Sequence, residues 1–270
     1  MDLGLNGKNV LIVGGNSNIG RATSLAFAKE GANVAIAARD LEASQEVART
    51  AGALGGGRAI AIKADATVFQ EAEAAVKKTL EEFGHIDVLV HGTAWDIIGS
   101  FLDLDPKHYD KIIAVNFTSV LYYFHLVLPL MISRRSGNIV TMSSVMGRRG
   151  EPGEPVYGAC KAGVIILCQA IARDVGRYGI RVNSVAPGPT FPGQDDKLSA
   201  DSVFNPSSSQ YPASGNMDVM VEKIKTITPL GKVGKTSDAV SAVLFLASDI
   251  TAGHVTGNVI GVDGGLYMGL

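Results

Sequence analysis

Three residues in the middle of the chain have side chains that could together move a proton: Ser144, Tyr157 and Lys161. Tyr157 and Lys161 are four residues apart, so a helix would place them one turn apart on the same face. Lowering the pKa of a phenol by about three units, so that it exchanges a proton at neutral pH, takes roughly 4 kcal/mol. A cation about 4 Å away, at an effective dielectric constant near 20, supplies roughly that amount. We therefore predict Tyr157 as a general acid/base, Lys161 as the cation that lowers its pKa, and Ser144 as the hydroxyl that polarises a substrate oxygen.

A glycine-rich turn near the N-terminus has the features of a phosphate-binding site. The apolar run from Asn9 to Val13 leads into Gly-Gly-Asn-Ser-Asn-Ile-Gly at 14–20 and then into an amphipathic helix. Glycines let the backbone approach a pyrophosphate, and the free N–H groups at the start of a helix favour its charge. The spacing differs from G-x-G-x-x-G, and a tight turn without a ligand is the alternative. The cofactor-binding residues predicted here are Gly14, Asn16, Ser17, Asn18, Ile19 and Gly20.

The ends of the next two predicted strands indicate which dinucleotide binds. A carboxylate at the end of the second strand would accept hydrogen bonds from a ribose 2′-OH, whereas an arginine would pair with a 2′-phosphate. The chain has Ala38 and Arg39 there, which favours NADP(H) over NAD(H). Asp40 could instead pair with Arg39 or reach the ribose, so NAD(H) stays as the alternative. Asp65, followed by Ala66, is positioned to bind the adenine amino group, unless it caps a helix.

The apolar pattern alternates between short β-branched runs and longer segments with helical period. Predicted strands cover Val10–Val13, Val34–Ala37, Ala59–Ile62, Val88–Val90, Ile139–Met142, Val182–Val185 and Val259–Val262. Predicted helices cover Ile19–Lys29, Phe69–Phe83, Tyr109–Met131, Tyr157–Tyr178 and Ser237–Leu246. Apolar strands separated by helices are typical of a parallel sheet covered on both faces. We predict an α/β fold: a single-domain Rossmann-type doubly wound parallel sheet of about seven strands over residues 1–270.

One segment interrupts this alternation. From Pro187 to about Ser214 the sequence is polar and irregular. A connection this long is typical of a lid or a binding loop, and a surface insertion without a role is the alternative. We predict a substrate-loop insertion at about 188–228.

Composition excludes several classes of partner. The chain has 270 residues, of which 46% are hydrophobic and 19% charged, with a net charge of −2, so it can bury a sizeable core. No Lys/Arg cluster exceeds a pair, which argues against nucleic acid. The longest apolar stretch, Val120–Ile132, is interrupted by His125 and Pro129 and is too short for a membrane span. With no secretory signal at the N-terminus, we expect a cytoplasmic protein.

The cysteines and histidines show no pattern of a disulfide or a metal site. Cys160 and Cys168 are eight residues apart in a predicted helix, about 12 Å between α-carbons, which is too far for a disulfide. The five histidines have no metal-ligand spacing with one another or with the cysteines. We predict packing roles for both cysteines and no metal.

Together, these motifs resemble the short-chain dehydrogenase/reductase family over about Lys8 to Leu266. The resemblance implies an NAD(P)-dependent oxidoreductase that interconverts a secondary alcohol and a ketone by hydride transfer. Ser144, Tyr157 and Lys161 match the family's catalytic triad, and Asn116 matches the helix asparagine whose backbone holds a relay water. The resemblance also implies cofactor contacts for Tyr157 and Lys161, and for Gly92, Pro187, Gly188 and Thr190.

Two motifs depart from the family pattern. In the nucleotide motif, Val13 replaces a threonine and Asn18 replaces the middle glycine. Asparagine tolerates left-handed backbone angles better than most residues, so the turn can survive. In the fourth strand, His91-Gly92-Thr93-Ala94 replaces Asn-Asn-Ala-Gly, so the family's contacts cannot be transferred there. We interpret His91 as a structural, hydrogen-bonded residue rather than a proton shuttle, and we predict that the cofactor still binds.

Residues just beyond these motifs could contact the substrate. Trp95, Met146 and Phe191 are candidate pocket walls, although core packing would explain them equally well. Four charged residues near the site could bind an anionic substrate: Arg148, Arg149, Glu151 and Glu154. The favoured interpretation is that they form a solvent-exposed rim. The substrate expected is a small carbonyl or alcohol compound.

Two other functions compete with carbonyl reduction. Enoyl-thioester reduction is disfavoured because that branch of the family spaces its tyrosine and lysine more widely than Tyr157 and Lys161. A catalytically silent nucleotide-binding scaffold or sensor on the same fold is the alternative outside enzymes. The resemblance also implies a homo-oligomer, a dimer or homotetramer, that pairs the helices predicted at Tyr109–Met131 and Tyr157–Tyr178.

Overall fold

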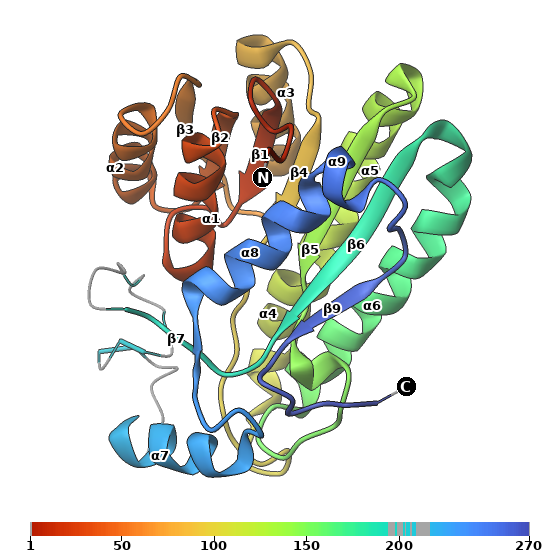
Figure 1. Cartoon of the computed structure of the whole chain (residues 1–270). Helices are drawn as coiled ribbons and strands as arrows, with labels where there is room; N and C mark the ends of the chain where they lie inside the picture. Colours follow the sequence, from red (N-terminus) through yellow and green to blue (C-terminus); the bar gives the residue numbers. More distant parts are fainter. Residues whose placement is uncertain are drawn as a thin grey trace.

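A computed structural model of the chain contains a seven-stranded parallel sheet, which confirms the predicted fold class (Figure 1). It describes residues 2–193, 198, 202, 204–205, 207–208 and 217–269. The strand order is β3-β2-β1-β4-β5-β6-β9. The strands are β1 (Asn9–Val13), β2 (Asn33–Ala38), β3 (Ala59–Lys63), β4 (Val88–His91), β5 (Gly137–Met142), β6 (Ile180–Pro187) and β9 (Val259–Val262). The crossover between β3 and β4 places the topological switch point beside β1, where ligands bind in such sheets.

The central strands are rich in apolar residues because both of their faces are covered. Every residue of β1, β4 and β6 is buried. The register pairs Val13 with Ala37 and with His91, and it pairs His91 with Thr141. The carboxyl ends of β1, β2, β4 and β5 therefore meet at one edge of the sheet, where the residues that follow them can form a site.

Helices form a layer on each face of the sheet, as Figure 1 shows. One layer consists of α1 (Asn18–Lys29), α2 (Leu41–Gly52) and α8 (Thr236–Ala247), followed by the short α9 (Asp249–Ala252). Phe27, Val47 and Leu246 pack from this layer into the core. The other layer consists of α3 (Phe69–Phe83), α5 (Ser119–Arg134) and α6 (Pro155–Val175), from which Val76, Tyr123 and Val164 pack into the core.

The long helix predicted from 109 to 131 is one continuous helical stretch with a change of winding. It consists of α4 (Tyr109–Ile113), a π-helical turn over Ala114–Thr118, and α5. A 3₁₀ turn at Pro106–His108 precedes α4. π-helical turns are rare and frequently lie at functional sites. This one carries Asn116.

The predicted insertion at 188–228 contains more regular structure than its composition indicates. Thr190–Phe191 forms β7, which pairs with β8 (Gly234–Lys235), and Met217–Ile227 forms α7. The rest of the predicted loop, at 194–197, 199–201, 203, 206 and 209–216, lies outside the described residues. α7 lies beyond the end of the sheet (Figure 1).

Two helical stretches, Pro106–Arg134 and Pro155–Tyr178, are long and apolar enough to cross a membrane by length and composition alone. Both pack against the sheet, where Tyr123 and Val164 are fully buried. Core helices of globular domains meet the same length and hydropathy criteria, so packing on the sheet accounts for their apolar composition.

Candidate active site

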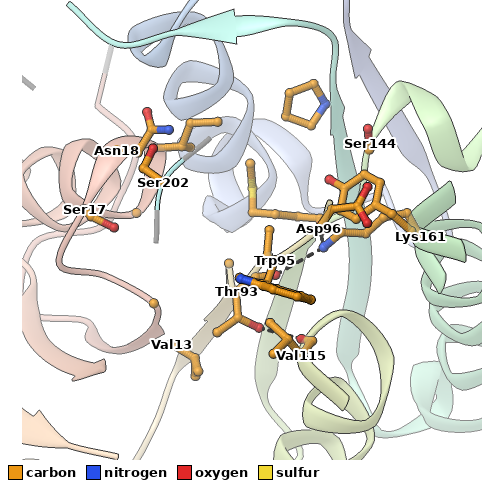
Figure 2. Close-up of a pocket in the computed structure, with 18 of the residues that line it drawn as sticks. Val13, Ser17, Asn18, Thr93, Trp95, Asp96, Val115, Ser144, Lys161 and Ser202 are labelled. Atoms are coloured by element: carbon orange, nitrogen blue, oxygen red, sulfur yellow. Dashed lines mark hydrogen bonds between the residues drawn. The ribbon is translucent and has the colours of Figure 1, made fainter. Parts of the chain in front are cut away.

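A cavity of about 1080 Å³ lies at the carboxyl ends of the strands. The turn after β1 and the residues that follow β2, β3, β4, β5 and β6 all contribute to its lining. Every residue that the sequence analysis assigned to catalysis, to the cofactor or to the candidate pocket walls lines this cavity, with the exception of Asn116. Figure 2 shows Ser17 and Asn18 on one side of the pocket and Ser144, Asp96 and Lys161 on the other.

The nucleotide turn adopts the conformation that a close approach of a ligand to the backbone requires. Gly14 has φ of +79°, and Asn18, the residue in place of the family's middle glycine, has φ of +47°. The expectation that asparagine would tolerate a left-handed conformation here is confirmed. At Gly20, an added Cβ would lie 1.9 Å from the carbonyl oxygen of Gly14, so only glycine fits between the two segments.

The residues of this turn fit a dinucleotide phosphate. The backbone at Gly14 and Gly20 carries no side chain that would cover it, and α1 begins at Asn18, so its first N–H groups lie beside the cavity. Asn18 Oδ1 is buried and has no hydrogen-bond partner among the described residues. A polar ligand at this turn would satisfy an atom that the described part of the chain leaves unpaired.

The residues expected to select the nucleotide lie at the same end of the cavity. Arg39 is exposed at the end of β2. Asp40 caps α2, because its Oδ1 accepts a hydrogen bond of 3.0 Å from Ala43 N. Asp65 accepts hydrogen bonds from the backbone and hydroxyl of Thr67, at 2.9 and 2.6 Å, which stabilise the turn before α3. The Asp40 side chain is thus the N-cap of α2.

Lys161 connects the two central strands. Its Nζ donates to the carbonyl oxygen of Thr93 at 3.2 Å, beyond the end of β4, and to that of Met142 at 3.0 Å, at the end of β5 (Figure 2). The side chain is buried, and burial lowers its pKa to about 8. Ser143 Oγ donates to the carbonyl oxygen of Lys161 at 2.9 Å and anchors the same residue from its backbone.

Tyr157 lies one helical turn before Lys161, as predicted. The Lys161 Nζ is 5.5 Å from the centroid of the Tyr157 ring. Burial raises the pKa of Tyr157 above its ordinary value, the negative charge of Glu154 raises it further, and a hydrogen bond with Ser144 opposes the increase. The sequence argument expected Lys161 to lower this pKa. The structure differs because the phenol is buried, two carboxyl groups lie near it, and the ammonium of Lys161 points at two backbone carbonyls.

Ser144 is held in place by the short helix that follows it. It has an extended backbone and caps the 3₁₀ turn Val145–Gly147, with its Oγ accepting from Met146 N at 3.1 Å. Its hydroxyl lies near Tyr157 and opposes the increase in the pKa of the phenol. Ser144, Tyr157 and Lys161 therefore meet in one cavity, from the end of β5 and from α6.

Asn116 lies behind the cavity rather than on its surface. Its Nδ2 donates to the carbonyl oxygens of Trp95 at 2.6 Å and of Ile112 at 2.8 Å, and its Oδ1 accepts from Trp95 N at 3.4 Å. The side chain thus fixes the segment after β4. A relay role for its backbone stays a prediction.

The replaced fourth-strand motif keeps contact with the site. Thr93 accepts from Lys161, and its Oγ1 donates to the carbonyl oxygen of Val115 at 3.0 Å. His91 is buried and packs edge-on against Tyr123, with 5.5 Å between ring centroids. Burial and the charge of Lys161 lower the pKa of His91 to about 3, while a hydrogen bond to the backbone of Ser119 opposes this. A neutral, packed His91 agrees with the structural role that we expected, but its buried Nε2 has no hydrogen-bond partner among the described residues.

Two carboxyl groups beside Tyr157 were not assigned to the site from the sequence. Asp96, directly after Trp95, lines the cavity, and burial with the charge of Glu154 raises its pKa to about 7. Glu154 also lines the cavity, and burial raises its pKa to about 7. The interpretation of Glu154 as part of a solvated rim is wrong, because its place three residues before Tyr157 turns it into the pocket. That spacing on α6 was the available signal.

The other charged residues of that segment do not line the cavity. The guanidinium of Arg148 lies 4.4 Å from the centroid of the Tyr267 ring. Arg149 pairs with Glu151 and donates to the carbonyl oxygen of Leu266 at 2.9 Å. Both arginines therefore hold the C-terminal segment against the domain.

No group of three or more metal-ligating side chains occurs within the described part of the chain. Cys160 and Cys168 are free and buried in α6, as their predicted packing roles require. The cavity contains groups that can exchange a proton or polarise a carbonyl, among them the serine, the tyrosine, the lysine and the two carboxyl groups.

Comparisons with known proteins find similarity over nearly the whole chain. The profile of the family described as enoyl-(acyl carrier protein) reductase matches residues 13–267. The 3-oxoacyl-(acyl-carrier-protein) reductase FabG of Thermotoga maritima is 35% identical over 264 residues, covering 98% of this chain and 99% of that protein. The protein of the same name from Staphylococcus aureus is 34% identical, covering 97% and 98%. The crystal structure of levodione reductase superposes with a TM-score of 0.86 at 28% identity, covering 96% of this chain and 97% of that one.

Gly20→Ala should weaken NADPH binding by at least about tenfold, which corresponds to about 1.4 kcal/mol. The added methyl group would displace the turn, because it would lie 1.9 Å from Gly14 O. Titration of NADPH fluorescence measures the dissociation constant. Gly52→Ala is the control, since a Cβ there meets no atom within 4 Å. Unchanged NADPH affinity in Gly20→Ala would contradict the assigned turn.

Glu154→Gln should change the pH dependence of stability. Burial raises the pKa of Glu154 from 4.5 to about 7, so the folded chain holds this proton more tightly than the unfolded chain. The stabilisation is fully present below pH 4.5 and is lost as the pH rises through about 7. Between pH 4.5 and pH 8, the wild type should lose up to about 3 kcal/mol of unfolding free energy relative to the variant.

Urea denaturation at both pH values measures this difference. The exposed Glu42 on α2 provides the control Glu42→Gln, for which the difference from wild type should stay constant with pH. A difference for Glu154→Gln that is equally independent of pH would show that Glu154 titrates as an ordinary carboxyl group.

Proposed function

Because the chain belongs to the short-chain dehydrogenase/reductase family, an oxidoreductase family that acts on CH–OH and C=O groups, we propose that it interconverts a ketone and a secondary alcohol with NADP(H). The observation that carries the proposal is the meeting of Ser144, Tyr157 and Lys161 in the cavity that also contains the nucleotide turn. Its relatives include two proteins named as 3-oxoacyl reductases and one named as a levodione reductase, whose names refer to carbonyl reduction.

In this proposal each of the three side chains has a separate role in the reaction at the substrate oxygen. Ser144 donates a hydrogen bond to the carbonyl oxygen, which polarises the C=O bond. Tyr157 gives its phenolic proton to that oxygen in reduction and accepts it back in oxidation. When bound, the nicotinamide supplies or accepts the hydride. Lys161, fixed by Thr93 and Met142, supplies positive charge beside the phenol and a donor toward the nicotinamide ribose.

Reduction of a carbonyl group is favoured over reduction of an enoyl thioester, although the matching profile carries the enoyl reductase description. Tyr157 and Lys161 are four residues apart and lie on one face of α6, and Ser144 lines the same cavity. This arrangement delivers a proton to an oxygen that Ser144 already polarises. A carbonyl oxygen fits that arrangement.

NADP(H) is favoured over NAD(H) because of the residues that follow β2. Asp40, the carboxylate that could have bound a ribose 2′-OH, is used as the cap of α2. The exposed Arg39 lines the same end of the cavity. A guanidinium pairs with a 2′-phosphate through charge-assisted hydrogen bonds, which are stronger than neutral ones.

We also propose a cytoplasmic homo-oligomer, a dimer or a homotetramer, that acts on a small-molecule substrate. Apolar side chains on the outer faces of α4, α5 and α6 support this assembly, among them Ile113, Leu121 and Ile166, which are 41%, 37% and 62% exposed. Exposed apolar side chains gathered on neighbouring helices are typical of subunit interfaces.

Tyr157→Phe should lower kcat for a ketone by roughly 10²- to 10⁴-fold, the contribution typical of a general acid/base. Loss of the hydroxyl removes the proton donor and leaves the ring in place, so the NADPH dissociation constant should change little. Oxidation of NADPH followed at 340 nm measures the rate.

Tyr178→Phe is the matched control, because Tyr178 lies outside the cavity. Full activity of Tyr157→Phe would overturn the assigned mechanism. If the wild type binds NADPH but reduces no ketone, the scaffold or sensor function gains support instead.

Arg39→Ala should weaken NADPH binding by at least about tenfold while NADH binding changes by less than about twofold, since only NADPH carries the 2′-phosphate. Arg49→Ala on the exposed side of α2 provides the control. Both dissociation constants follow from nucleotide fluorescence. A wild type that prefers NADH would refute the choice of cofactor and leave the reaction class intact.

A further inference from the structure

The turn that carries Ser144 is short, and its shape depends on what holds its two ends. Ser144 Oγ accepts from Met146 N at 3.1 Å, so the 3₁₀ turn Val145–Gly147 orients the hydroxyl that the proposed reaction uses. The backbone N–H groups of Arg148 and Arg149 close this turn, because both donate to the carbonyl oxygen of its first residue, at 3.0 and 3.1 Å. Hydrogen bonds of 3₁₀ turns have poorer geometry than those of α-helices, so contacts outside the turn contribute to its shape.

The sheet and α6 hold the first end of the turn. Ser143 N donates to the carbonyl oxygen of Val185 at 2.7 Å, and Ser143 Oγ donates to that of Lys161 at 2.9 Å. Gly147 packs against the same helix, since an added Cβ there would lie 2.6 Å from the carbonyl carbon of Lys161. Residues 150–153, which follow the turn, are half-buried or exposed. The side chains that can hold the second end are therefore those of the two arginines that close it.

Arg148 contacts the C-terminal segment, which we define as Gly261–Tyr267. Its guanidinium lies 4.4 Å from the centroid of the Tyr267 ring. An added Cβ at Gly261 would overlap Nη1 of Arg148, so the guanidinium occupies space that a side chain on this residue of β9 would fill. Arg148 thus lies between the end of the sheet and the tyrosine.

Arg149 makes a second contact with the same segment. Its Nη1 donates to the carbonyl oxygen of Leu266 at 2.9 Å, and its Nε pairs with Glu151. The Arg149 side chain is 51% exposed, so this hydrogen bond alone contributes little to stability. Because the two arginines are adjacent and contact adjacent residues, Leu266 and Tyr267, they hold the end of the turn together.

The C-terminal segment is also attached to other elements around the cavity. The carbonyl oxygen of Val262 accepts from Gly188 N at 2.9 Å, and an added Cβ at Gly188 would lie 2.8 Å from Asp263 Cα. Gly188 lines the cavity. Further along, the carbonyl oxygen of Gly264 accepts from Leu230 N at 3.1 Å, shortly after the end of α7. One segment therefore contacts the turn of the catalytic serine, the turn at Gly188 and the residues that follow α7.

We propose that the C-terminal segment positions Ser144 for catalysis and that Arg148 and Arg149 are the positioning residues through which it acts. Neither arginine lines the cavity, so their effect on the reaction passes through the turn. By joining the turn to β9, they fix the Ser144 hydroxyl relative to Gly188. A displacement of about 1 Å at a reacting group can lower the rate roughly 10²-fold. This inference rests on the proposed ketone–alcohol function and adds two residues to it.

The test is the double variant Arg148→Met, Arg149→Met, because methionine keeps much of the apolar stem of arginine and removes the guanidinium. The ketone is cyclohexanone or ethyl 3-oxobutanoate, whichever the wild type reduces faster with NADPH. We expect kcat to fall by about tenfold or more, while the NADPH dissociation constant changes by less than about twofold. Arg173→Met is the matched control, an exposed arginine on α6 that does not line the cavity.

A double-mutant cycle shows whether the arginines act through Ser144. Changes that act through one group are not additive. In the Ser144→Ala background, the two methionine substitutions should lower kcat by less than about twofold, because the hydroxyl that they position is already absent. A general structural role would lower kcat by the same factor in both backgrounds.

A second variant and a second measurement address the turn directly. Gly261→Ala leaves both arginines in the chain but displaces the guanidinium of Arg148, so kcat should fall in the same direction. The Met146 amide bonds to Ser144 Oγ, so its hydrogen exchange reports whether the turn is held. We expect this exchange to be about tenfold faster in the double arginine variant, with exchange in β5 unchanged.

The outcomes separate this inference from the function on which it rests. An unchanged kcat in the double arginine variant, or an equal loss in the wild-type and Ser144→Ala backgrounds, overturns the positioning role and leaves the ketone–alcohol function standing. An unchanged exchange rate at Met146 overturns it as well. If the wild type binds NADPH but reduces no ketone, the proposed function itself fails, and the exchange rate still shows whether the arginines hold the turn.

Discussion

The site depends on one buried cation held between two strand ends. Removing an ammonium group from water is costly unless acceptors replace the water, and here the carbonyl oxygens of Thr93 and Met142 do so. These two carbonyls come together only because β4 and β5 pair in a register that sets His91 opposite Thr141. A slip of one residue would turn the alternate side chains of the strand to the other face and separate the acceptors. The position of Lys161, and with it that of Tyr157 one turn earlier on α6, is thus fixed by the sheet.

Burial of the sheet on both faces explains how much of the fold could be predicted from the sequence. All seven strands of the sheet were predicted near their observed positions, because strands buried on both faces are rich in apolar, β-branched residues. The predictions did not include α2 or α7. Only a narrow stripe of α2 is buried, at Ser44, Val47 and Ala51, and a single residue of α7, Ile224, is buried. Both helices are nevertheless amphipathic, so a helical period was present in the sequence at these positions. The π-helical turn at Ala114–Thr118 has no local sequence signal, since it accommodates the contacts of Asn116 with the Trp95 segment.

For the site, local motifs predicted residues that the fold brings into one cavity, and tertiary contacts determined what the motifs could not. The glycine turn and the Tyr–Lys pair are each contained in one strand–helix or helix segment, so their geometry follows from spacing alone. Asp96 and Glu154 are 58 positions apart in the chain, as their numbers give, and their joint effect on Tyr157 arises only when β4 and α6 are packed together. Glu154 was interpreted as a surface residue because it stands among other charged residues, and its spacing of three from Tyr157 was the signal that this interpretation passed over.

These carboxyl groups also change the chemistry expected of Tyr157. Burial acts first and the two carboxyl groups add to it, so the pKa of the phenol is raised and Tyr157 keeps its proton at neutral pH. A proton donor to a carbonyl oxygen must begin in that protonated form, so the electrostatics of the cavity suit the proposed reduction.

Oxidation requires the opposite, a phenolate, and the positive charges available to favour it are Lys161 and an oxidised nicotinamide. Because Lys161 is already engaged by two carbonyls and its own pKa is lowered to about 8, the balance between the two directions depends on how much negative charge the carboxyl groups carry. Their pKa values of about 7 place that charge where small changes near neutral pH alter it, so the proton affinity of the tyrosine depends on pH through these two acids.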